Sequence, residues 1–157
     1  MSERTRTSSG DRTNTKQILY LIDTNVISEA RKRARANRGV RQFFRRVIKE
    51  RTPVFLSVVT IGELRRGIEL LRHRGDSRQA ERLKEWLEAL LSEYRDFILD
   101  MDTDIAQLWG RLRVPHPENA LAKQIAATAL IHDLTVVTRN QADFRKTGVC
   151  VFNPFTE

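Results

Sequence analysis

Short apolar runs alternate with amphipathic segments along most of the chain, and this alternation restricts the fold more than any other feature. Residues 18–22, 54–59, 97–99, 134–138 and 149–152 are rich in Val, Ile, Leu and Phe and have the length of buried strands. Between them lie segments with apolar residues at helical spacing, most clearly at residues 77–95. Strands that alternate with helices predict an α/β fold with a mainly parallel sheet.

The net positive charge of the chain comes from its first third. The 157 residues carry a net charge of +8, and residues 1–51 hold 14 basic against 5 acidic side chains. We predict a disordered basic tail over residues 1–16, which are rich in Ser, Thr and Arg, and a single domain over residues 17–157. The charge is typical of a protein that meets nucleic acid or another polyanion, and a merely solvated surface is the alternative.

Composition excludes several other classes of protein. The only cysteine, Cys150, cannot support a disulfide framework or a cysteine-based zinc cage, and we expect it to be a buried thiol in an apolar strand. No apolar run approaches the roughly 18 residues of a membrane span. We therefore expect a soluble, cytoplasmic protein that makes no use of a membrane.

Acidic side chains stand where ligands bind in parallel sheets, at the carboxyl ends of the predicted strands. Asp23 follows the first strand, Glu63 lies at the start of the helix after the second, and Asn140 and Asp143 follow the fourth. If these strands are neighbours, the acids converge and need a cation such as Mg²⁺ or Mn²⁺. Such a site can activate water for the cleavage of a phosphodiester bond.

Each acid also has a purely structural alternative. Glu63 completes a helix capping box with Thr60, and Asp23 could be an Asx-turn or cap residue. Asp143 could be an ordinary loop carboxylate.

Four segments form a recognisable set of motifs: LIDTNVISE (residues 21–29), SVVTIGEL (57–64), IAATA (125–129) and VTRN followed by DF (137–140, 143–144). Together they resemble the PIN-domain ribonucleases, in particular the VapC toxins and their FitB-like branch, and the resemblance runs from about residue 19 to residue 155. It implies a three-layer α/β/α sandwich and an endoribonuclease that depends on Mg²⁺ or Mn²⁺. It also implies a homodimer, a VapB-type antitoxin that blocks the site, and an RNA substrate for which tRNA is one plausible class.

The resemblance also assigns roles to individual residues. Asp23 and Glu63 match the first two acidic ligands of the family, and Asp143 or its neighbour Asn140 matches the fourth motif. The polar positions that shape the site are Thr24, Asn25 and Thr138. Basic residues that could grip the RNA backbone are Arg31, Arg33, Arg41 and Arg45.

One position departs from the family pattern. Ala122 stands three residues before Ile125, where the family typically has an aspartate, so one expected metal ligand is missing. Either the natural protein is impaired, or the acid was replaced to silence a toxic nuclease. The intact remaining motifs favour replacement.

Two classes of function follow from these residues. The first is a toxin with metal-dependent endoribonuclease activity, weakened by Ala122. The second is a non-catalytic RNA- or protein-binding module for which Ala122 is native. A phosphatase of the haloacid dehalogenase type is disfavoured, because Asn25 occupies the position of its second aspartate.

Overall fold

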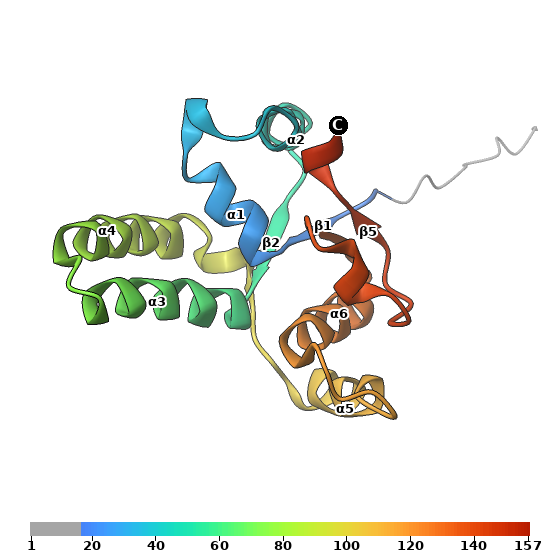
Figure 1. Cartoon of the computed structure of the whole chain (residues 1–157). Helices are drawn as coiled ribbons and strands as arrows, with labels where there is room; N and C mark the ends of the chain where they lie inside the picture. The colour runs from blue at the N-terminus through green and yellow to red at the C-terminus, as the bar shows by residue number, and fades with distance from the viewer. Residues whose placement is uncertain (1–16) are drawn as a thin grey trace, which may run out of the picture.

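The computed structural model describes residues 17–157, and the predicted tail at residues 1–16 lies outside them (Figure 1). Strands and helices alternate as the hydrophobic pattern predicts. The strands are β1 (Tyr20–Ile22), β2 (Val54–Ser57), β3 (Ile98–Leu99), β4 (Thr135–Val137) and β5 (Val151–Phe152). The α-helices are α1 (Thr24–Ala30), α2 (Arg38–Lys49), α3 (Val58–His73), α4 (Ser77–Glu93), α5 (Thr103–Leu112) and α6 (Ala120–His132). Short 3-10 turns lie at η1 (Arg33–Arg35), η2 (Arg95–Phe97), η3 (Gln141–Phe144) and η4 (Pro154–Thr156).

All strand pairs in the sheet are parallel. The strand order is β3-β2-β1-β4-β5, so β1 is central and pairs with both β2 and β4. Leu21 of β1 stands opposite Phe55 on one side and Val136 on the other. This topology confirms the predicted α/β/α fold class.

The two faces of the sheet bury different helices. Ile22 and Val137 point into a core shared with α1, α2, α3 and α4, whereas Leu21 and Val136 point into a second core with α6. Figure 1 shows α5 and α6 on one side of the strands and α1 to α4 on the other. The alternation of neighbouring side chains along a strand therefore separates the three layers.

Capping side chains set the starts of two helices. Helix α1 begins at Thr24, because Asp23 caps it, and ends at Ala30 before η1. Helix α3 begins at Val58 rather than Thr60, because the Ser57 hydroxyl accepts the Val59 N–H at 3.1 Å.

The capping-box alternative for Glu63 is therefore wrong. Thr60 lies inside α3 and cannot cap it, and Glu63 lies in the second turn of the helix. The expectation of a buried Cys150 is also wrong: the residue precedes β5 and its side chain is exposed. Over residues 17–157, no helix is long and apolar enough to cross a bilayer.

Candidate active site at the carboxyl edge of the sheet

The strand order brings the predicted polar residues to one edge of the sheet. Since β1 lies between β2 and β4, the residues that follow these strands (Asp23, Val58 and Thr138) stand side by side. The Asp23 N–H donates to the carbonyl oxygen of Val137 at 2.9 Å, which continues the β1–β4 ladder up to the site. The condition on which the sequence argument depended, that these strands are neighbours, is met.

Asp23 is a buried carboxylate held by three hydrogen bonds. Its side chain accepts the Thr24 N–H at 2.8 Å, the Thr138 hydroxyl at 2.8 Å and the Asn25 amide at 3.2 Å. Only 8% of the residue is exposed. The carboxylate is therefore fixed in place before any ligand arrives.

The pKa of Asp23 lies above its ordinary value of 3.8. Burial is the main cause, because it penalises the charged form, and the negative charge of Asp143 adds to it. The hydrogen bonds from Thr138, Thr24 and Asn25 act in the opposite direction. The structure thus holds a carboxyl group whose ionised form would be stabilised by a nearby cation.

The predicted site-shaping residues form one network around Asp23. The Thr138 hydroxyl accepts the Asn140 N–H at 3.0 Å, and the Asn25 side-chain carbonyl accepts the Arg139 N–H at 3.0 Å. These bonds join the start of α1 to the turn after β4, so the two segments hold each other in position. On the other side, the Thr24 hydroxyl donates to that of Thr60 at 3.3 Å and ties α1 to α3.

The other two acids lie on opposite sides of Asp23. Asp143, in η3, is close enough for its charge to act on Asp23. Glu63 lines a small cavity of about 160 Å³ with Thr24 and Arg31. Within residues 17–157, no three His, Cys, Asp or Glu side chains lie close enough together to hold a metal ion.

Ala122 occupies the first turn of α6, beside this edge. Helix α6 packs against η3, the turn that carries Asp143. The Ala122 methyl packs against the core around Leu21 and Ile125. A carboxylate at position 122 would therefore stand at the start of a helix, where the helix dipole favours negative charge.

The predicted RNA-binding arginines divide into two groups. Arg31 shares the small cavity with Glu63 and Thr24. Arg33, Arg41 and Arg45 line another groove of about 420 Å³ with an apolar floor that includes Phe44. Arg31 and Arg33 also line one cavity together, so the two groups adjoin. The structure brings only Arg31 together with the predicted site residues.

Two residues near the edge were not singled out from the sequence. Thr60 is fully buried and accepts the hydrogen bond from Thr24. Lys123 is only 8% exposed, and its amine donates to the backbone carbonyl of His116. Lys123 stands two residues before the buried segment at residues 125–129, and this position near a buried helical face is the sequence signal that could have identified it.

Comparison with known proteins agrees with this arrangement. The family model described as PIN domain matches residues 20–149. The toxin FitB of Neisseria gonorrhoeae is 36% identical over 143 residues, which cover 87% of this chain and 99% of FitB. The VapC ribonuclease Y4jK of Sinorhizobium fredii is 33% identical over 141 residues, which cover 87% of this chain and 98% of the relative.

A solved structure extends the similarity to three dimensions. The crystal structure of FitAcB from Neisseria gonorrhoeae superposes with a TM-score of 0.75 at 35% identity, covering 88% of this chain and 99% of the other. The family match spans most of the described residues, and two curated relatives above 30% identity span nearly their whole length. The chain belongs to the PIN-domain family and is a homologue of the FitB and VapC toxins.

Proposed function

We propose that this chain is the toxin of a toxin–antitoxin pair and an endoribonuclease that depends on Mg²⁺ or Mn²⁺, with its cleavage weakened by Ala122. The observation that carries the proposal is Asp23: a buried, hydrogen-bonded carboxylate with a raised pKa, beside Asp143, at the carboxyl ends of neighbouring parallel strands. The FitB and VapC relatives are named as toxins and, for Y4jK, as a ribonuclease, which supports the same class of activity.

The side chains at this edge of the sheet are of the type that binds a divalent cation, but they provide fewer carboxylates than such a site needs. Carboxylate oxygens are the donors that Mg²⁺ and Mn²⁺ prefer. Of the predicted ligands, Asp23 and Asp143 would hold the ion, and Glu63 would join them only by moving closer, because no three such side chains form a close group within residues 17–157. When bound, the ion polarises a water and the scissile phosphate. A carboxylate at position 122, in the helix that packs against η3, would add an acid to this pair.

The remaining steps use the side chains of the chain itself. Thr138 and Asn25 fix the orientation of the Asp23 carboxylate through the bonds described above. Arg31, beside Glu63, would contact a phosphate of the RNA backbone, and Asp23 and Asp143 would orient the attacking water. Because Arg33, Arg41 and Arg45 line a different groove, their predicted contact with RNA remains a proposal.

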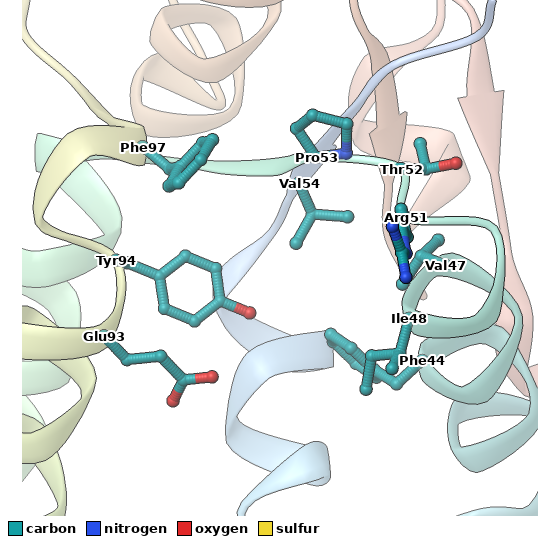
Figure 2. A pocket seen from close by; sticks show the side chains of 10 residues that line it. All are labelled: Phe44, Val47, Ile48, Arg51, Thr52, Pro53, Val54, Glu93, Tyr94 and Phe97. Atoms are coloured by element: carbon teal, nitrogen blue, oxygen red, sulfur yellow. The ribbon is translucent and has the colours of Figure 1, made fainter.

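The groove lined by Arg33, Arg41 and Arg45 would bind a segment of the antitoxin. Phe44 lines three cavities, one of which is this groove. Figure 2 shows another of them, with a volume of about 300 Å³, between Phe44 and Ile48 on α2 and Tyr94 and Phe97 on the opposite side. The Nε of Arg41 is buried and has no hydrogen-bond partner among the described residues. An acidic segment with apolar side chains would cover the apolar floor and satisfy this donor.

The oligomeric state proposed for this chain is also inferred from its relatives. The solved relative is a complex of FitB with FitA. We propose a homodimer of this chain, bound to an antitoxin of that kind in a larger assembly. Light scattering of the purified chain at micromolar concentration tests the dimer, and a monomeric mass would contradict it.

The decisive experiment restores the missing carboxylate. Loss of even an outer-shell partner of a metal ligand commonly costs roughly 10–100-fold in activity, so Ala122→Asp should raise cleavage of total cellular RNA by about 100-fold or more. The gain should require Mg²⁺ or Mn²⁺ and vanish with a chelator. Sequencing of the fragment ends would identify the cut site.

A matched control separates a metal ligand from added negative charge. Leu121→Asp places the same carboxylate in the same turn of α6, on a side chain that is already 48% exposed. It should leave cleavage unchanged. If Ala122→Asp cleaves no faster than Leu121→Asp in either metal, the chain is the non-catalytic binding module instead.

A further inference from the structure

Another cavity opens beside the acid pair of Asp23 and Asp143, and binding of a metal ion does not account for it. It has a volume of about 420 Å³, within the roughly 300–1,000 Å³ of typical ligand sites. Its walls come from the loop between α5 and α6, the first turn of α6 and the segment that follows η3. Asp143 lines it and also acts electrostatically on Asp23, so the cavity begins where the candidate active site ends.

Charged side chains of both signs line the cavity. Glu118 lies 3.6 Å from the His116 ring, and Lys123 is buried and donates to the His116 carbonyl. Arg145 and Lys146 line it too and are exposed. Neither Arg145 nor Lys146 forms an ion pair with an acid within residues 17–157, so both cations can contact a phosphate group of a ligand.

Apolar side chains supply another part of the wall. Val114 is 77% exposed, and it lines the cavity together with Leu112 and Pro115. An exposed apolar surface next to exposed cations matches the two halves of a nucleotide: a flat base that packs on apolar groups and a phosphate that pairs with cations. The tie between Lys123 and His116 holds the loop that carries Val114 and Pro115 against α6.

We propose that this cavity is a nucleotide subsite: it binds the RNA nucleotide next to the phosphodiester that is cut. The base packs on Val114 and Pro115, and Lys146 and Arg145 contact its phosphate. Asp143 forms the border between this subsite and the acid pair, so a nucleotide seated here places the adjacent phosphodiester at Asp23. The inference rests on the proposed function and names where that function binds its substrate.

The first test measures binding with the chain as it is, which retains Ala122. The probe is a fluorescent twelve-residue oligouridylate, followed by anisotropy over a range of salt concentrations. Lys146→Gln and Val114→Asp should each weaken binding roughly three- to tenfold, and Lys146→Gln should lower the salt slope by about 0.7–1. Lys49→Gln, a matched loss of an exposed lysine on α2, should change affinity less than about twofold.

The second test locates the RNA directly. The same oligonucleotide with 4-thiouridine is cross-linked by light, and the attached peptides are identified by mass spectrometry. Cross-links within residues 112–119 or 145–147 are expected. Cross-links confined to other segments, or unchanged affinity in both Lys146→Gln and Val114→Asp, would overturn the subsite.

The Ala122→Asp variant distinguishes failure of the proposed nucleotide subsite from failure of the proposed nuclease function. In the Ala122→Asp background, Lys146→Gln should raise KM with little change in kcat. Cleavage by Ala122→Asp that is insensitive to Lys146 and Val114 would refute the subsite and keep the nuclease. Cross-links in the cavity without any cleavage by Ala122→Asp would refute the nuclease and keep an RNA site.

Discussion

The carboxyl edge of the sheet and the groove around Phe44 are organised in opposite ways. At the edge, hydrogen bonds join residues more than a hundred positions apart, such as Asp23 and Thr138, and the Asp23 carboxylate accepts three of them. In the groove, arginines from α2 and the turn before it surround an apolar floor, and the buried Nε of Arg41 lacks an acceptor in the described part of the chain. The hydrogen bonds of Asp23 are therefore made within the chain, whereas the Arg41 donor in the groove is left without an acceptor among residues 17–157.

The largest effect should come from removing the charge at the centre of the edge. In the Ala122→Asp background, Asp23→Asn should lower RNA cleavage by about 100-fold or more, because the amide cannot serve as an anionic metal ligand. Urea unfolding at pH 7 should show little or no loss of stability, since the ionised carboxylate is penalised by burial.

The two readouts together decide the role of Asp23. A large loss of stability with no loss of activity would make it a helix cap and nothing more. Asp104→Asn, an acid exposed on α5, is the control and should alter neither measurement.

The next largest effect should be a loss of stability when the contact between α2, which lines the groove, and η4 is disturbed. A Cβ at Gly39 of α2 would lie 1.8 Å from the carbonyl oxygen of Pro154, so Gly39→Ala should destabilise the fold by about 1–3 kcal/mol. Gly62→Ala in α3 meets no atom within 4 Å and should stabilise the fold by up to about 1 kcal/mol. Denaturant unfolding of both variants measures the contrast, and equal effects would show that η4 does not hold α2 in place.

Charge reversals test whether the two regions have separate partners. Arg31→Glu should weaken RNA binding roughly three- to tenfold for many sequences alike, because Arg31 lies beside Glu63. Arg45→Glu, in the groove, should change it by less than about twofold. Anisotropy with several unrelated RNAs checks both variants. An Arg45→Glu loss as large as that of Arg31→Glu would make the groove part of the RNA surface.

The smallest effect is a pair of opposite pH dependences at the two ends of α1. Burial raises the pKa of Asp23, so its cost to stability is absent below pH 3.8 and grows as pH rises through the folded-state pKa. Lys32 lowers the pKa of Glu29, so its contribution is present above pH 4.5 and is lost as pH falls through the folded-state pKa. Relative to the unsubstituted chain, Asp23→Asn should gain stability with rising pH and Glu29→Gln should lose it.

Urea unfolding from pH 3.5 to 7 with a chelator present measures both slopes. Slopes of the same sign for the two variants would contradict the assignment. Both carboxylates belong to the same short helix, Asp23 as its N-cap and Glu29 in its last turn, so each variant serves as a reference for the other.

The hydrophobic pattern of the sequence was sufficient to predict the order of strands and helices, but it did not predict where each helix begins and ends. The strand that leads to Asp23 and the helix that carries Ala122 both follow from runs of apolar residues. The start of α3 did not, because Ser57 and Thr60 are both residues that cap helices, and the backbone path at Ser57 selected the earlier one. That difference moved Glu63 into the second turn and away from a capping role.

The sequence by itself determined the alternation of strands and helices, the residues that follow each strand and the vacant acidic position at Ala122. These features depend on neighbours a few positions apart, through backbone preference and the face that each segment buries. Only the tertiary structure decided that Asp143 acts on Asp23 while Glu63 lines a cavity with Thr24 and Arg31. It also decided that a cavity with charged and apolar walls lies at Asp143. Those contacts depend on which strands pair and how the helices pack across the sheet, and the local pattern of a chain does not specify either.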